Sequence, residues 1–323
     1  MKRLAVFLSI IICLILSVGC TGANSPSSLT LVCPDGAPAI SAYALKDTKV
    51  NVTVYPSASA TASIQKDIRN KSADVAILPV NLASKLCASG ADYKMIGVLT
   101  HGNLYGVGKN VLDENGLKGK TVGVIQLNAV PGYTVKLMLE KMGLQYVENK
   151  EEKNADNVYL YQIPADATAV KTALDTSKAD VCIVAQPMCD RLISAFSLIK
   201  SIDVQSLYGY FPQAVAVVKT SVLENRKSEV NEMIASLSGC DYTALNATEL
   251  VNWINLHVAD GEVSSLAPQA LTVSALEGSN IRFSPAQNEK SAVLNYLTQL
   301  KRFDTELGTV AIAVGDTFFW SGV

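Results

Sequence analysis

The sequence predicts an α/β fold of two lobes, each a mainly parallel sheet flanked by helices. Short apolar runs alternate with helix-like segments, which is typical of βαβ units. The alternation begins at residue 29, restarts at residue 118, and gives way to helix-like segments after residue 221. The 323-residue chain is also longer than one ordinary hydrophobic core needs, which favours two domains.

The start of the chain predicts export and anchoring. A charged beginning precedes an apolar run over residues 4–16, which is shorter than the roughly 20 residues that span a bilayer. The run closes in LSVGC, which resembles the bacterial lipobox and implies a signal peptide over residues 1–19 and a diacylated Cys20. The alternative is an ordinary signal with an incidental cysteine. Residues 20–28 hold too few apolar groups to pack and predict a flexible linker.

The strands and helices are predicted in alternation. Pro38 and Pro131 suit the first turn of a helix, where a missing N–H costs nothing, and Gly90 and Gly143 suit helix ends. Ser and Thr side chains at the start of the second helix are able to cap it. The expected strands cover residues 29–33, 50–55, 74–78, 94–99, 104–108, 118–125, 157–163, 180–185 and 214–219. The expected helices lie within residues 34–46, 56–70, 79–90, 131–142, 165–174 and 188–196, and everything from residue 221 is expected to be helical.

Composition argues against several classes of function. The net charge of −2 offers no basic surface for nucleic acid, so no nucleic-acid partner is expected. Two histidines are too few for a His-rich metal site, and neither a metal nor a cofactor is expected. The cysteines beyond the signal and the anchor show no disulfide spacing and are expected to be buried, mostly free thiols; they are Cys33, Cys87, Cys182, Cys189 and Cys240.

Ligands of parallel sheets bind at the carboxyl edge, where each strand hands over to a helix. Apart from Asp35, the loops at this edge hold no charged residue; they cover residues 35–38, 57–61, 79–82, 100–103, 126–132 and 185–187. An anion would rest on helix N-termini there, because these carry fractional positive charge. A neutral heterocycle or amide would use the side-chain amides. The lack of Lys and Arg favours the neutral ligand.

Catalysis is difficult to build from this sequence. No GxSxG, Walker or GxGxxG motif occurs. His257 lies on a partly apolar helix and is expected to pack. His101 stands in an open loop beside Gly102, where it either contacts the ligand or is a plain turn residue.

Four segments carry a family resemblance: GAPAISAYAL, SADVAILPVNLASKL, GVIQLNAVPGYTVKLMLEKMGL and IRFSPAQNEKSAVLNYLTQL. They resemble the solute-binding lipoproteins of ABC transporters, in the group with nitrate, sulfonate, taurine and thiamine-precursor binders. The resemblance implies a type II periplasmic-binding-protein fold, whose lobes close on the ligand. Residues 29–108 and 215–323 would form lobe 1 and residues 109–214 lobe 2, with crossovers near residues 104–109 and 213–217.

The resemblance also implies which residues face the ligand. Gln186 stands where relatives often have Glu, and His101 where they often have an aromatic residue. The implied ligand-binding residues are Gly36, Ala37, Pro38, Ser57, Ser59, Pro79, Val80, Asn81, His101, Gln126, Asn128, Ala129, Gln186, Pro187 and Gln213.

The resulting expectation is a monomeric, non-enzymatic receptor, anchored outside the cytoplasm by a lipid on Cys20. It would capture a small neutral or singly anionic organic solute, of the sulfonate or thiamine-precursor type, and present it to the ABC permease subunits in the membrane. Two alternatives remain open. One is an enzyme of the same fold, of the thiamine-pyrimidine synthesis type, and the other is a ligand-sensing receptor for a membrane signalling protein.

Overall fold

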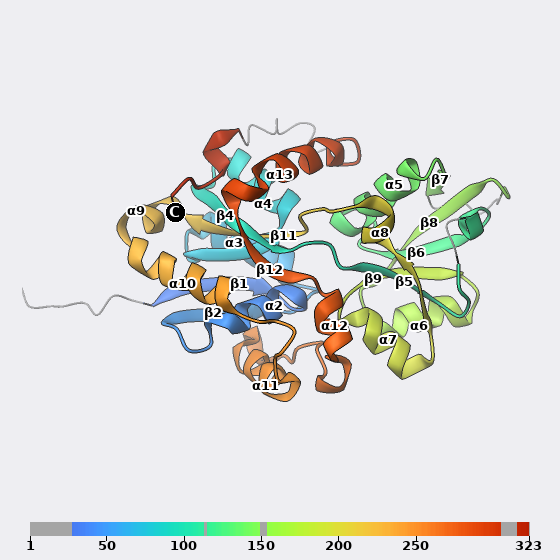
Figure 1. Ribbon diagram of the computed structural model, residues 1–323, viewed down its shortest axis with the longest axis horizontal. Coiled ribbons are helices and arrows are strands. Elements are labelled where there is room, and N and C mark those ends of the chain that lie inside the picture. The colour runs from blue at the N-terminus through green and yellow to red at the C-terminus, as the bar shows by residue number, and fades with distance from the viewer. Residues whose placement is uncertain (1–27, 113–114, 149–153, 305–314, 323) are drawn as a thin grey trace, which may run out of the picture.

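Two six-stranded sheets flanked by helices make up the protein (Figure 1). The computed structural model describes residues 28–112, 115–148, 154–304 and 315–322. The predicted signal peptide and Cys20 lie outside the described residues. Among the described residues, none of the helices combines the length and the apolar character that a membrane span needs.

The first sheet has the strand order β12-β4-β11-β3-β1-β2. Strand β1 is parallel to β2 and β3, whereas β11 is antiparallel to β3 and β4, and β12 is antiparallel to β4. Residues of β3 alternate between two apolar clusters, so both faces of this sheet are buried. The strands are β1 (Leu29–Pro34), β2 (Val50–Tyr55), β3 (Val75–Pro79), β4 (Tyr93–Thr100), β11 (Ala214–Lys219) and β12 (Ile281–Pro285).

The second sheet has the order β10-β5-β9-β6-β8-β7. Strands β9, β6, β8 and β7 run parallel, and only β5 runs against its neighbours. Both sheets therefore have most strands in one direction, as the sequence predicts. The strands are β5 (Leu104–Gly108), β6 (Thr121–Ile125), β7 (Gln145–Glu148), β8 (Asn157–Ile163), β9 (Val181–Ala185) and β10 (Ile199–Asp203).

The helices follow the strands closely. Gly90 and Gly143 have positive φ and end their helices as predicted, but Ser59 makes no side-chain cap at the start of α3. The helices are α2 (Ala37–Ala42), α3 (Ala60–Asn70), α4 (Val80–Ala88), α5 (Val130–Lys141), α6 (Ala167–Asp175), α7 (Met188–Phe196), α8 (Val204–Tyr208), α9 (Thr220–Asn225), α10 (Lys227–Gly239), α11 (Ala247–His257), α12 (Val273–Gly278) and α13 (Ala286–Leu300).

Three details of the chain path differ from the sequence prediction. The sequence assigns residues 104–108 to the first lobe, but β5 pairs with β9 and β10 in the second sheet, because the chain has already crossed over at residues 101–103. The region after residue 221 is not wholly helical, since β12 adds an edge strand to β4. The short strands β7 and β10 are not predicted; their burial is low, so they lack a clear apolar pattern.

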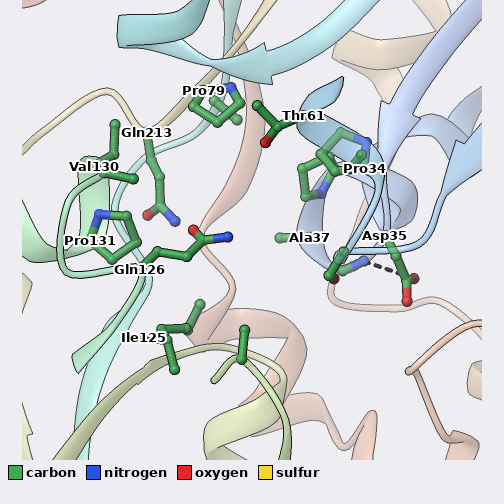
Figure 2. A pocket seen from close by; sticks show the side chains of 18 of the residues that line it. Pro34, Asp35, Ala37, Thr61, Pro79, Ile125, Gln126, Val130, Pro131 and Gln213 are labelled. Atoms are coloured by element: carbon green, nitrogen blue, oxygen red, sulfur yellow. Dashed lines mark hydrogen bonds between the residues drawn. The ribbon is translucent and has the colours of Figure 1, made fainter. Parts of the chain in front are cut away.

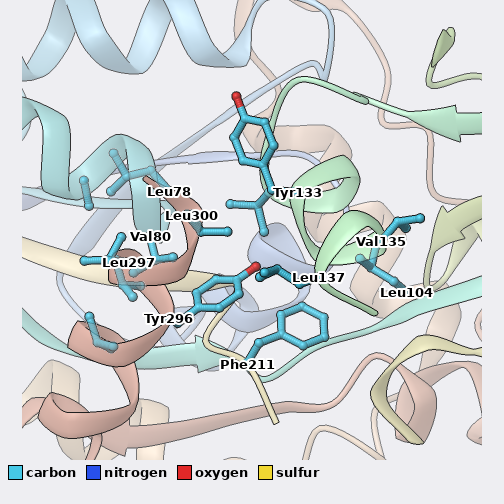
Figure 3. Packing of buried hydrophobic residues seen from close by; sticks show 14 of the residues in the cluster. Leu78, Val80, Leu104, Tyr133, Val135, Leu137, Phe211, Tyr296, Leu297 and Leu300 are labelled. Carbon is cyan, nitrogen blue, oxygen red and sulfur yellow. The ribbon is translucent and has the colours of Figure 1, made fainter. Parts of the chain in front are cut away.

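Helix α13 joins the two sheets through a buried apolar seam (Figure 3). Tyr296, Leu297 and Leu300 of α13 belong to the same cluster as Leu137 of α5 and Phe211. Phe211 lies in residues 209–213, the second crossing segment, by which the chain returns to the first sheet. The hydroxyl groups of Thr134 and Tyr296 lie 2.6 Å apart in this seam, and at its edge Arg302 donates to Glu140 over 2.8 Å. The sheets are thus held together along one side by a continuous core.

Candidate functional site

A cavity of about 730 Å³ lies between the two sheets. Strands β1, β3, β6 and β9 all end at it, and the residues after each strand line it together with the start of the following helix. Pro34 and Ala37 border it from the first sheet, and Ile125, Gln126 and Pro131 border it from the second (Figure 2). This is the position at which open parallel sheets bind ligands.

The floor of the cavity is formed where the chain passes between the sheets, by Thr100, Asn103, Gln213 and Ala214. The backbone of Gln213 is held on both sides, because its N–H donates to Thr100 O over 2.9 Å and its carbonyl accepts from Val80 N over 3.1 Å. Asn103 O accepts from Gln186 N over 2.9 Å. Backbone hydrogen bonds therefore fix the floor to strands or helix starts of both sheets.

The loop between β6 and α5 forms the wall on the side of the second sheet. Gln126 has a φ of 53°, in the left-handed region, and its side chain is exposed to the cavity. Tyr133 Oη donates to Asn128 O over 2.7 Å and holds the loop from behind. Gly132 packs directly on this loop, since a Cβ there would lie 1.9 Å from Leu127 O.

Charged side chains at the cavity are paired with protein groups. Lys85 Nζ lies 2.7 Å from Asp304 Oδ2, with both side chains largely buried. Arg191 of α7 donates to Ser265 O over 2.7 Å, and Ser265 in turn donates to Asp35 through its N–H, at 2.6 Å, and its hydroxyl, at 2.7 Å. This chain of contacts crosses from the second sheet to the first. Lys85 is thus offset by Asp304, whereas Arg69 of the lining contacts the neutral Gln65 Oε1 over 3.4 Å.

No protein-family model matches the sequence, and no curated protein matches it. Solved structures do. An ABC transporter protein from Parabacteroides distasonis superimposes with a TM-score of 0.69 at 20% identity, over 92% of this chain and 100% of that one. The periplasmic aliphatic sulphonate binding protein SsuA from Escherichia coli gives 0.63 at 14% identity, over 92% and 93%. The alkanesulfonate-binding protein SsuA from Xanthomonas axonopodis pv. citri, bound to MOPS, gives 0.55 at 14%, over 86% and 93%. This chain has the type II periplasmic-binding-protein fold.

In this binding-protein fold, most of the predicted ligand-binding residues come together at the cavity. They are contributed by both sheets and by the second crossing segment. Those that line it are Gly36, Ala37, Pro38, Ser57, Pro79, Asn81, Gln126, Asn128, Ala129, Gln186, Pro187 and Gln213. Ser59 is exposed at the start of α3, outside the lining, and Val80 is fully buried in the apolar core below it. Val80 turns to the core as the first residue of α4, and the Ser59 hydroxyl donates to Pro56 O over 3.3 Å.

His101 does not line the cavity. It is 1% exposed, its Nε2 lies 3.0 Å from Arg282 O, and its Nδ1 lies 3.0 Å from Tyr210 Oη. Because a carbonyl only accepts, Nε2 carries the hydrogen. Burial, assisted by the Arg282 charge, lowers the pKa of His101 to about 4. The imidazole therefore holds β12 to the first crossing segment, residues 101–103. At this position the sequence predicts either a ligand contact or a plain turn residue.

Several lining residues of the binding-protein fold are missed by reading the loops alone. Lys85 and Ser89 follow Asn81 at intervals of four along α4, so all three lie on one helix face toward the cavity. Gln65 and Arg69 follow Thr61 in the same way on α3. This spacing was the available signal. Arg191 follows Pro187 in the same way on α7, and Thr100 and Asn103 lie in the predicted edge loop of residues 100–103. Asp304 has no such signal, because its partner Lys85 is distant in sequence.

The thiols offer no nucleophile to the cavity. All five cysteines of the described ranges are free, as predicted, and Cys182 and Cys189 are fully buried. Burial raises the pKa of both thiols to about 12, so they stay protonated at neutral pH. Within the part of the chain that the structure describes, no group of His, Cys, Asp and Glu side chains is arranged to hold a metal ion.

Proposed function

We propose that this chain is the solute-binding component of an ABC importer. The observation that carries the proposal is the cavity of about 730 Å³ enclosed between two lobes, lined from both by uncharged loop residues. Solved structures of binding components with this fold, including the two sulfonate-binding proteins, support the role. The partners would be a small solute and the permease subunits of the membrane, and the receptor would act as a monomer without enzymatic activity or cofactor.

The proposed solute is a small organic molecule that is neutral or singly anionic, of the sulfonate or thiamine-precursor and heterocycle type. The pairing of Lys85 with Asp304 supports this class, because the charge of this lysine is already offset by a carboxylate of the protein. Amide side chains of Gln126, Asn128 and Asn81 line the cavity and are available for hydrogen bonds.

Thermal unfolding with a panel of alkanesulfonates, pyrimidines and small heterocycles tests this proposal. A ligand at 100 times its Kd should stabilise the protein by about 2.7 kcal/mol. Gln126→Ala should weaken binding by roughly five- to tenfold, about 1 kcal/mol, because the exposed amide is lost from the cavity wall. Gln145→Ala, an exposed glutamine on β7 away from the cavity lining, is the matched control and should bind normally. Failure of every compound to stabilise the protein would show the ligand class to be wrong.

We also propose that Cys20 carries the lipid that keeps the receptor outside the cytoplasm at the cell membrane, after cleavage behind residue 19. The lipobox-like LSVGC supports this. Growth with labelled palmitate should label the wild-type chain and leave Cys20→Ala unlabelled. Cys13→Ala, in the segment to be removed, should label like wild type. Label on Cys20→Ala, or none on the wild type, would contradict the anchor.

A further inference from the structure

The orientations of two amide side chains on the cavity floor are fixed by backbone groups. Asn103 Nδ2 donates to Gln186 O over 3.1 Å, and since a carbonyl only accepts, the other end of this amide must be Oδ1. The N–H of Asn103 donates to Gln213 Oε1 over 3.2 Å, and since an N–H only donates, the free end of Gln213 must be Nε2. The backbone contacts thus leave one acceptor, Asn103 Oδ1, and one donor, Gln213 Nε2, without a backbone partner on two hydrogen-bonded residues of the floor.

These two ends lack protein partners. Asn103 is 1% exposed, and its Oδ1 is buried with no hydrogen-bond partner in the described part of the chain. Thr100 Oγ1, on the same floor, is likewise buried and unsatisfied among the described residues. Gln213 is half-buried, and its Nε2 makes no hydrogen bond that the structure records. Buried polar atoms are nearly always satisfied, so unsatisfied ones at a ligand cavity indicate a ligand group.

We propose that Asn103 and Gln213 select solutes that present an N–H donor beside a carbonyl or ring-nitrogen acceptor, as the edge of a lactam, ureide or aminopyrimidine does. This inference rests on the proposed solute-binding function and assigns its specificity. The solute N–H satisfies Asn103 Oδ1, and its acceptor takes the hydrogen of Gln213 Nε2. A sulfonate or carboxylate group has only acceptors and leaves Asn103 Oδ1 unsatisfied, which costs roughly 10- to 100-fold in affinity at this position.

The remaining walls accept such a solute without specifying its polarity. Gln126, Gln213, Pro131 and Ile125 all line the cavity, and Figure 2 shows the Gln126 side chain extending into it. The amide of Gln126 makes no hydrogen bond recorded among the described residues and is exposed, so it can turn either end to the solute. The apolar neighbours suit the faces of a small ring.

Calorimetric titration with uracil, hydantoin and 4-aminopyrimidine, against methanesulfonate and acetate, tests the selection on the wild-type protein. For uracil, 1,3-dimethyluracil is the matched probe, because it keeps the ring and carbonyls but lacks the N–H donors. At least one N–H compound should bind, and for uracil methylation should weaken binding at least tenfold.

Gln213→Glu keeps the acceptor for Asn103 N and replaces the Nε2 donor with oxygen, so binding should fall roughly 10- to 100-fold. Gln145→Glu, at an exposed position on β7 outside the cavity lining, adds the same charge and should change affinity less than threefold.

The outcomes separate this inference from the proposed function. Three results would overturn the selection while the proposed solute-binding function still stands. They are preferential binding of sulfonates over every N–H compound, equal binding of uracil and dimethyluracil, and normal binding by Gln213→Glu. If no probe binds, mass spectrometry of small molecules released from the purified protein decides: a compound with the N–H and acceptor edge supports the selection, and one without it overturns the selection. No binding together with no released compound would overturn the proposed function as well.

Discussion

Gly132→Ala is expected to destabilise the protein by about 3 kcal/mol and to abolish the cavity wall formed by the β6–α5 loop. A Cβ at this position would lie 1.9 Å from Leu127 O and 2.3 Å from Leu127 C. Both are backbone atoms, so no side-chain rotation relieves the contact, and the loop or the start of α5 must move. Gln126 and Asn128, which line the cavity on this loop, would move with it. Urea unfolding measures the first effect, and calorimetry with any solute that binds the wild type measures the second, an expected loss of at least tenfold in affinity.

Gly239→Ala is the matched control for this prediction. Gly239 ends α10, and no heavy atom lies within 4 Å of the Cβ that alanine would add. The same substitution there should be neutral or stabilise the protein by about 0.5 kcal/mol, through the entropy of the unfolded chain. Unchanged stability and unchanged solute affinity in Gly132→Ala would contradict the packing described for the loop.

The parts of the fold that depend on local pattern could be predicted. Strands β1, β3, β6 and β9 are short apolar runs followed by turn residues, and a parallel sheet brings their carboxyl ends to one edge whatever the order of the strands. The loops at this edge therefore reach the cavity, as most of the predicted residues do. Strand β12 is not predicted, although residues 281–284 alternate between apolar and polar side chains. The alternation covers only four residues, and the place of the strand depends on pairing with β4 through an irregular register.

The cavity floor and His101 show where local pattern fails. Asn103 becomes a candidate specificity residue only through Gln186 and Gln213, which are 83 and 110 positions away in the chain. His101 looks open beside Gly102, yet Tyr210 and Arg282, 109 and 181 positions away, enclose it. Loop composition also underestimates the charge near the cavity, since Lys85 and Arg69 reach it from helix faces. Contacts of this range are set by the tertiary fold, and spacing within one segment does not report them.

Lowering the pH from 7 to 4.5 is expected to remove roughly 2 kcal/mol of stability through His101. The pKa of this imidazole is about 4 in the folded protein, because burial and the Arg282 charge oppose protonation. In the unfolded chain its pKa is close to 6.5, the ordinary value. Between these values the unfolded state binds a proton that the folded state does not, so stability falls as the pH drops through this window. Tyr210 and Glu289 also face the imidazole, and the nearby Glu289 opposes only part of the shift.

His101→Gln isolates this contribution. Glutamine retains an N–H donor for Arg282 O and cannot titrate, so the variant should be less stable at pH 7 and should lose less stability between pH 7 and 4.5 than the wild type. Urea unfolding at both pH values measures the difference in slope, and the imidazole NMR signal missing from His101→Gln identifies His101 for direct titration. A midpoint for that signal above pH 6, or equal slopes in the two proteins, would contradict the enclosure. The pH dependence of stability then reports directly on the packing between β12 and the first crossing segment. The imidazole stays neutral only while Arg282, Tyr210 and this segment are packed around it.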